Sequence, residues 1–197
     1  EYGALDANLA KVRKLVKEAC DNGANFLVLP EVFNQGMIGS DRATAFSLAE
    51  SIPDGKTTQT LLELATENKV YICGSFIELD GPDLYNTAIL VGQEGFIGKY
   101  RKLHPCEDEV YYIEPGNLGI PVFHTPIGRI ALLICLDGYY PETYRIAALQ
   151  GADIVCVLFN AKDVHESRKM PEGMYTAITS LCLANALSNH IFVVGCN

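Results

Sequence analysis

The sequence predicts an α/β fold in which helices alternate with buried strands of a mixed sheet. Segments with apolar residues at helical spacing alternate with short apolar runs rich in β-branched residues, which favours layered α/β packing. One central segment is typical of a β-hairpin, so part of the sheet is antiparallel. The chain has 197 residues and 49% hydrophobic content, which predicts one core in a single domain over residues 1–197.

The first half of the chain supplies two predicted helices and two strands. Residues 8–24 place apolar side chains on one helical face, and Asn22-Gly23 provides a stop signal. The apolar positions of this face are Leu9, Val12, Leu15, Val16 and Ala19. The other elements follow in order: a short buried strand at 25–31, an amphipathic helix at 57–69 and a strand at 70–79.

The second half begins with the hairpin, at residues 84–102. Its turn is predicted at Gln93-Glu94-Gly95. The later elements are a buried strand at 128–137, a helix at 141–152 with Pro141 at its first turn, a strand at 153–159, a helix at 174–190 and a strand at 191–196. Because the chain starts in a helix and stops after a strand, we expect the domain to be incomplete at both termini.

Composition excludes several classes of partner. The net charge is −9, from 24 acidic and 15 basic residues, and basic residues concentrate only at 99–102. Neither nucleic acid nor a membrane is therefore expected as a partner. The seven cysteines are irregularly spaced and the four histidines are scattered, so we expect free thiols and no metal site. No apolar stretch is long enough for a membrane span and no signal-peptide layout is present, which predicts a cytoplasmic protein.

Four polar residues lie where predicted strands end: Glu31, Lys102, Glu109 and Cys135. Loops just past strand ends collect catalytic groups because their backbone is fixed while their side chains stay accessible. Each residue also has an ordinary structural interpretation. Cysteine is a common buried filler, the two glutamates fit solvated acids, and the lysine belongs to a basic surface cluster.

A functional interpretation of Cys135 rests on the polar loop and helix start that follow it. A thiol that faces a helix N-terminus or a lysine has a lowered pKa, and the thiolate is the attacking species. A fixed cation such as Lys102 would stabilise the oxyanion of a tetrahedral intermediate. A conventional cysteine–histidine pair with His104 or His124 remains an alternative.

Around these residues lie three segments, "LVLPEVF", "GKYRKLHP" and "ICLDGYYPE". In this order they resemble the motifs of the nitrilase superfamily, the carbon–nitrogen hydrolases, and the likeness continues through "YNTAILVGQEGFIGKYRK" and "EPGNLGIPVFHTPIGRIALLIC". The resemblance implies a four-layer αββα sandwich without a metal or organic cofactor. It also implies a catalytic triad formed by Glu31, Lys102 and Cys135.

The resemblance assigns a role to each site residue. Cys135 would attack the carbonyl or nitrile carbon, Glu31 would act as general base, and Lys102 would hold the oxyanion together with the backbone N–H of Leu136. Glu109 matches an additional glutamate that positions the lysine and the substrate.

Two further positions follow from the same resemblance. The backbone contact that the family makes after the next strand falls near Asn160, and Tyr139 is a candidate for lining the substrate pocket. Family members pair across their helical faces, which implies a homodimer or a larger homo-oligomer. They also begin with a core strand before the first helix and continue past "GCN", so both termini are expected to be incomplete here.

The segment "DGYYPETYR" resembles amidases and N-carbamoyl amide hydrolases more than nitrilases, whose cysteine is followed by Trp-Glu instead of Leu136-Asp137. We therefore expect hydrolysis of a small amide or N-carbamoyl compound through a cysteine thioester, with release of ammonia. A nitrilase that converts a nitrile to acid and ammonia, or a non-catalytic binding module, are the alternatives.

The sequence also bears on whether the substrate carries a carboxylate. Members that bind N-carbamoyl amino acids often have arginines shortly after the cysteine, where this chain has Gly138 and Tyr139. Arg145, Lys162 or Arg168 would have to replace them for a substrate with a free α-carboxylate. We expect Arg145 to pair with a carboxylate on its own helix instead.

Overall fold

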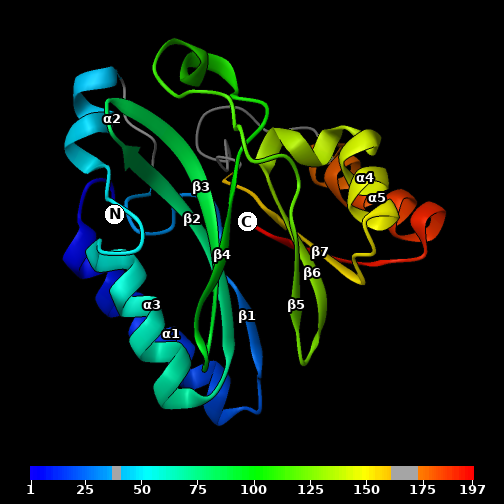
Figure 1. Ribbon diagram of the computed structural model, residues 1–197, viewed down its shortest axis with the longest axis horizontal. Coiled ribbons are helices and arrows are strands. Elements are labelled where there is room, and N and C mark those ends of the chain that lie inside the picture. The colour runs from blue at the N-terminus through cyan, green and yellow to red at the C-terminus, as the bar shows by residue number, and fades with distance from the viewer. Residues whose placement is uncertain (37–40, 161–172) are drawn as a thin grey trace.

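The computed structural model describes residues 1–36, 41–160 and 173–197. Two four-stranded sheets lie between two layers of helices, with α1 and α3 on one outer side and α4 and α5 on the other (Figure 1). The helices are α1 (Leu5–Asp21), α2 (Arg42–Leu48), α3 (Lys56–Asn68), α4 (Pro141–Leu149) and α5 (Gly173–Asn189), with two 3₁₀-helices, η1 (Glu107–Tyr111) and η2 (Cys135–Tyr139). The predicted αββα sandwich is confirmed.

Both sheets are mixed, as predicted. The first sheet has the order β1-β2-β3-β4, with β1 parallel to β2 and the other pairs antiparallel. The second has the order β5-β6-β7-β8, with β5 antiparallel to β6 and the other pairs parallel. The strands are β1 (Phe26–Val28), β2 (Tyr71–Asp80), β3 (Asp83–Gly92), β4 (Gly95–Arg101), β5 (Val122–Thr125), β6 (Gly128–Ile134), β7 (Ile154–Leu158) and β8 (Phe192–Cys196).

The hairpin predicted at residues 84–102 is confirmed as β3 and β4. Gly92 pairs with Gly95 across a turn made by Gln93 and Glu94. Gly95 has φ +111°, a backbone conformation that glycine adopts without a steric penalty. This turn fixes the register of β4, so Lys102 comes directly after its end.

Three local features differ from the sequence-based prediction. The strand predicted through residue 137 ends at Ile134, because the chain turns into η2 at Cys135. The short strand β5 was not predicted, since four residues carry too little pattern and the strand depends on pairing with β6. Helix α2 was not predicted either, although Asp41 caps it by accepting a hydrogen bond from the Thr44 amide (2.9 Å).

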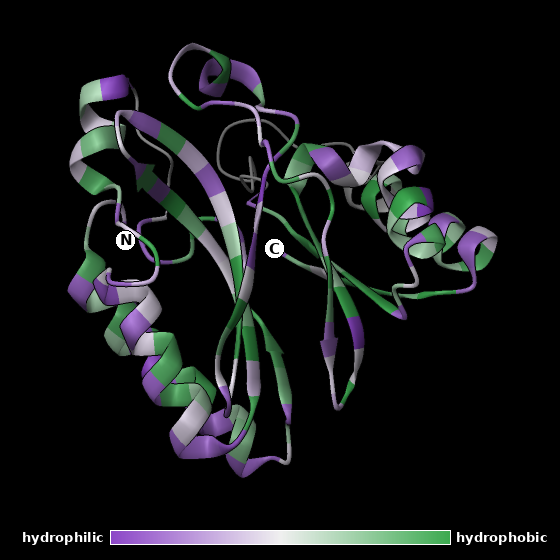
Figure 2. Cartoon of the chain, viewed as in Figure 1, coloured by the Kyte–Doolittle hydropathy of each residue, from purple (hydrophilic) through white to green (hydrophobic). Residues whose placement is uncertain are grey.

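The apolar contacts that hold the layers explain why the strand ends are fixed in place. Between the sheets, Leu90 and Tyr100 of the first sheet pack in one cluster with Leu132 and Val157 of the second. A separate cluster packs α1 and α3 against the outer face of the first sheet. Figure 2 shows long hydrophobic stretches along β6 and β7, which are buried on both faces.

The first helix buries the face that the sequence predicts, with one exception. Leu9, Val12 and Val16 are buried, whereas Leu15 is 49% exposed and lies at the edge of the apolar face. In the part of the chain that the structure describes, no helix combines the length and apolar character that crossing a membrane requires.

Candidate active site

The four residues singled out at strand ends come from both sheets. Glu31 follows β1 and Lys102 follows β4, the two edge strands of the first sheet, while Cys135 follows β6 in the second. The Glu31 backbone N–H donates to the carbonyl of Phe159, just past β7, at 3.0 Å. This bond joins the ends of the two sheets directly beside the candidate site.

A buried ion cluster joins three of these residues. The Lys102 Nζ lies 2.9 Å from Glu31 Oε1 and 2.7 Å from Glu109 Oε2. The side chains of Lys102, Glu31 and Glu109 are 1%, 3% and 6% exposed. Charges so fully removed from water interact strongly and are costly to leave unpaired. The lysine is therefore fixed between the two carboxylates.

Backbone and amide donors complete the surroundings of the two carboxylates. Glu109, in η1, accepts a hydrogen bond from the Cys106 backbone N–H at Oε2 (2.7 Å). The Asn86 side chain of β3 donates from Nδ2 to Glu31 Oε1 (2.8 Å) and to Glu109 Oε1 (3.2 Å). Asn86 is also fully buried, and its backbone carbonyl accepts from the Lys102 N–H at 2.8 Å.

Cys135 occupies a strained position at the junction of β6 and η2. Its φ is +47°, in the left-handed region that non-glycine residues rarely adopt, and Val32, next to Glu31, has φ +45°. Such conformations persist where surrounding contacts hold them and occur frequently at active sites. The Glu31 carboxylate and the Asn160 backbone are close enough to the thiol to act on its pKa.

The protonation equilibria of the cluster depend on burial and on its internal charges. Burial, together with the charge of Glu109, raises the pKa of Glu31 above its ordinary value, although Lys102 and Asn86 oppose the shift. Burial alone would lower the pKa of Lys102, but the two carboxylates outweigh it and the pKa is raised. The lysine therefore carries a positive charge throughout the neutral range.

The cysteine differs from the sequence-based expectation of a lowered pKa. Burial and the negative charge of Glu31 raise the pKa of Cys135 from its ordinary value of 9.0 to about 12, and Lys102 only partly opposes them. Desolvation disfavours a thiolate, and the nearest carboxylate repels it. The resting residue is thus a neutral thiol in contact with a carboxylate able to accept its proton.

A third buried carboxylate, Asp137, links the cysteine turn to the segment after Lys102. Its Oδ2 accepts from the Tyr100 hydroxyl (2.6 Å) and from the Ile134 N–H (3.3 Å). Its Oδ1 accepts from the His104 backbone N–H (3.0 Å) and lies 2.7 Å from His104 Nδ1. The histidine ring also packs on Tyr140, with centroids 4.3 Å apart. His104 thus contacts Asp137, whereas the groups that act on the pKa of the Cys135 thiol are Glu31, Lys102 and the Asn160 backbone.

The structure places Leu136, Tyr139 and Asn160 near the cysteine turn, but not His124. Leu136 and Tyr139 are partly buried residues of η2, and Tyr139 packs against the core between the sheets. Asn160 follows β7, and besides its backbone contact with Cys135 its side chain donates to the Gly36 carbonyl (3.3 Å). His124 lies in β5 and is exposed.

Asn86 and Asp137 were missed as site residues by sequence reasoning, although each carried a signal. Asn86 interrupts the apolar strand "LYNTAILV", and a polar residue at such a position needs buried partners. Asp137 comes two residues after Cys135, so an acid lay beside the candidate nucleophile. Neither signal identifies the partner, because the partners are distant in the sequence. Glu31 is 55 residues from Asn86, and Tyr100 is 37 residues from Asp137.

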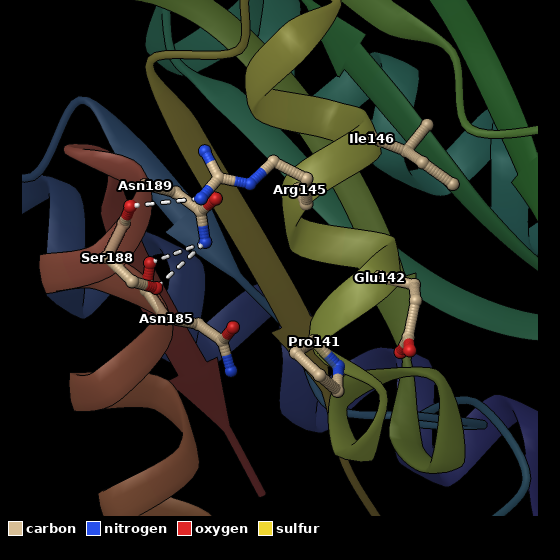
Figure 3. A pocket seen from close by; sticks show the side chains of 7 residues that line it. All are labelled: Pro141, Glu142, Arg145, Ile146, Asn185, Ser188 and Asn189. Carbon is tan, nitrogen blue, oxygen red and sulfur yellow. Dashed lines mark hydrogen bonds between the residues drawn. The ribbon is translucent and has the colours of Figure 1, made fainter.

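A separate groove of about 420 Å³ lies between α4 and α5 and contains none of the four clustered residues (Figure 3). Arg145 lines it and donates to the Ser188 backbone carbonyl of α5 at 3.5 Å. This contact differs from the expected pairing with a carboxylate on its own helix. Lys162 and Arg168 lie outside the described residues.

All seven cysteines are free thiols in the structure. Within residues 1–36, 41–160 and 173–197, no three His, Cys, Asp or Glu side chains are grouped to hold a metal ion. The site described above consists of one thiol, one ammonium, two carboxylates and one amide. Such a set combines a nucleophile, a proton acceptor and a cation in one buried place.

Comparison with known proteins identifies the family. The model of the carbon-nitrogen hydrolase family matches residues 2–197. The chain belongs to this family, and so to the nitrilase superfamily.

Two curated relatives and one solved structure show how far the likeness extends. A protein named nitrilase from Pyrococcus abyssi is 42% identical over 84% of this chain and 63% of its own length. The N-carbamoylputrescine amidase of Solanum lycopersicum is 33% identical over 77% of this chain and 52% of its own length. The crystal structure of a carbon-nitrogen hydrolase from Helicobacter pylori G27 has a TM-score of 0.89 at 24% identity, covers 98% of this chain and 69% of that one, and shows the same fold.

Proposed function

We propose that the chain carries the active site of a thiol hydrolase that cleaves the C–N bond of a small amide or N-carbamoyl compound. The observation that carries this proposal is the buried contact of Lys102 with Glu31 and Glu109 beside the Cys135 thiol. The chain spans 63% and 52% of the lengths of the two curated relatives, so the activity of the whole protein is part of the proposal.

In the first half of the reaction, Cys135 Sγ attacks the substrate carbonyl carbon while its proton passes to the Glu31 carboxylate. The carbonyl oxygen becomes an oxyanion, which Lys102 and the backbone N–H of Leu136 stabilise. Glu31 then gives the proton to the leaving nitrogen as the C–N bond breaks. Ammonia departs and the acyl group remains on Cys135 as a thioester.

The second half uses the same groups for hydrolysis. Glu31 takes a proton from water, which attacks the thioester carbonyl carbon, and the new oxyanion is held as before. Collapse breaks the C–S bond and returns the proton to sulfur. The balance is one amide and one water consumed, with one carboxylic acid and one ammonia formed.

The raised pKa values suit this sequence of steps. A neutral thiol needs a base at the moment of attack, and a carboxylate whose pKa is raised by burial is a stronger base than an exposed one. Lys102 keeps its positive charge throughout, so it offers a constant field to the oxyanion. Glu109 is a second carboxylate in contact with the ammonium, at 2.7 Å.

Two observations favour an amide or carbamoyl substrate. Leu136 and Asp137 follow the nucleophile, and the Solanum lycopersicum relative is named an N-carbamoylputrescine amidase. Nitrile hydrolysis is the second candidate, because the Pyrococcus abyssi relative carries the name nitrilase. Both reactions need the same nucleophile, so substrate tests must separate them.

The test measures ammonia released by the full-length protein from a short aliphatic amide, an N-carbamoyl amine, an N-carbamoyl amino acid and a nitrile. We expect release from an amide or an N-carbamoyl compound, and loss of that release in Cys135→Ala. Release from the nitrile alone would establish the second candidate. No release from any of the four by a folded protein would favour a non-catalytic binding module.

A further inference from the structure

Asn86 contacts three members of the cluster, and the family resemblance that assigns the other residues gives it no role. It lies in β3, between the two edge strands whose ends carry Glu31 and Lys102. Its Nδ2 donates to both carboxylates, at 2.8 Å to Glu31 and 3.2 Å to Glu109. Its backbone carbonyl accepts from the Lys102 N–H at 2.8 Å. One residue thus contacts both acids and the segment that carries the lysine.

The orientation of the amide follows from its partners. With Nδ2 toward the carboxylates, both of its hydrogens are used, whereas Oδ1 in the same place would face two acceptors. Oδ1 is buried and has no hydrogen-bond partner among the described residues. Burying this oxygen without a partner costs free energy. The two hydrogen bonds that Nδ2 donates to the carboxylates are therefore what favours an amide at this position.

We infer that Asn86 is a positioning residue for the general base. It shares Glu31 Oε1 with Lys102, and the same Nδ2 also donates to Glu109, so Asn86 bridges the two carboxylates and holds the base with a second donor. This inference rests on the proposed function, because it assigns Glu31 the role of base. It adds a residue that acts on the reaction through Glu31 without touching the substrate.

The effect of Asn86 on proton transfer has a definite direction. The titratable and charged groups that face Glu31 are Lys102, Glu109, Cys135 and Cys106. Of these only Lys102 favours the carboxylate form, so Asn86 is the second group that stabilises the ionised base. Its loss makes Glu31 harder to ionise, and the base becomes active only at higher pH.

The test follows the alkylation of Cys135 by iodoacetamide as a function of pH, with the modified peptide measured by mass spectrometry. This readout needs no substrate. In the full-length protein we expect the rate to rise as Glu31 ionises and then to level off, before a second rise at higher pH as the thiol itself ionises. Glu31→Gln should remove the first rise and leave the second. In Asn86→Asp, an additional carboxyl group replaces the donor. We expect the rise that follows Glu31 ionisation to move upward by about one pH unit. At a fixed pH within that rise, this shift corresponds to a rate about tenfold lower.

Two further variants separate positioning from simple structural support. Asn86→Leu removes the donors without adding charge, and it replaces Asn86→Asp if that protein does not fold; the same upward shift is expected. Asn34→Asp is the matched control, because Asn34 is also fully buried, donates to Glu50 (3.0 Å) and Thr57 (2.9 Å) and has an Oδ1 without a partner in the described part of the chain. We expect Asn34→Asp to leave the pH dependence in place.

The experiment distinguishes a failure of the inference on Asn86 from a failure of the proposed role of Glu31 as base. If Glu31→Gln removes the rise that follows Glu31 ionisation while the folded Asn86 variant keeps the wild-type profile, the inference on Asn86 is overturned and the proposed base stands. A shift of equal size in Asn34→Asp would also overturn it, since the effect would then come from stability alone. If Glu31→Gln keeps the wild-type profile, the assignment of Glu31 as base is itself wrong.

Discussion

The Lys102 ammonium and the Glu31 carboxylate form an ion pair at 2.9 Å that is almost completely removed from solvent. The two residues are 71 positions apart in the chain and follow the opposite edge strands of one sheet. Asn86 of β3 also donates to Glu31 Oε1, the carboxylate oxygen that Lys102 contacts.

Glu31→Gln keeps the size of the side chain and removes the base. We expect the protein to fold and kcat to fall by a factor of about 10² to 10⁴, the usual contribution of a general base. The measurement is kcat on the best substrate of the panel, with thermal unfolding as a check of the fold. A loss of less than about tenfold would show that another group accepts the thiol proton.

Lys102→Met removes the cation and leaves two buried carboxylates facing each other. Breaking a buried pair in this way costs about 3–5 kcal/mol, so we expect a loss of unfolding free energy in that range in urea titrations, together with lost activity. Lys56→Met is the control, because Lys56 is 60% exposed in its pair with Asp6 and should change stability by less than about 1 kcal/mol. Equal losses in the two variants would contradict the account.

The raised pKa of the Cys135 thiol should make the free energy of unfolding depend on pH. Its folded pKa is raised from 9.0 to about 12, so the folded state binds the proton more tightly than the unfolded chain does. This contribution is complete below pH 9 and is lost as the pH rises toward 12. Relative to Cys135→Ala, the wild type should lose about 1.4 kcal/mol of unfolding free energy per pH unit in that window.

Urea unfolding of both proteins at pH 7.5 and pH 10.5 provides the measurement. Using the difference between them removes the contribution of the other thiols and tyrosines, which are common to both. A difference that stays constant between the two pH values would mean that the folded thiol has an ordinary pKa.

Asp137→Asn tests the link between the cysteine turn and the segment after Lys102. The carboxylate accepts from Tyr100, His104 and Ile134, and an amide cannot accept from all of them. We expect a loss of about 1.5–3 kcal/mol in urea unfolding and a lower kcat. Asp153→Asn, which affects the exposed pair with Arg129, should cost less than about 1 kcal/mol, and a similar cost for both would argue against the link.

The sequence predicted most of the architecture because its signals are local. The hairpin follows from Gln93-Glu94-Gly95, and the two-sided burial of β6 and β7 follows from their continuous apolar runs. Helix α2 and strand β5 are short, and their formation depends on a cap or on pairing with another strand. Patterns over so few residues do not distinguish them from loops.

The candidate site was predictable as a set of positions but not as an electrostatic system. Glu31, Lys102, Glu109 and Cys135 stood out at strand ends, and the structure brings them together. The pKa of Cys135 was expected to fall because a lysine lies near it, yet burial and the charge of Glu31 reverse the direction. The burial of the whole cluster depends on how the two sheets pack together. It cannot be predicted from any one segment of the sequence.

The most direct test of the central claim is to trap the thioester on Cys135. The full-length protein would be mixed with its best amide or N-carbamoyl substrate and quenched with acid, and its peptides would be analysed by mass spectrometry. We expect the acyl group on the peptide that contains Cys135, removable by hydroxylamine and absent in Cys135→Ala. Ammonia release that proceeds in Cys135→Ala, or an acyl group found only on another residue, would contradict the account.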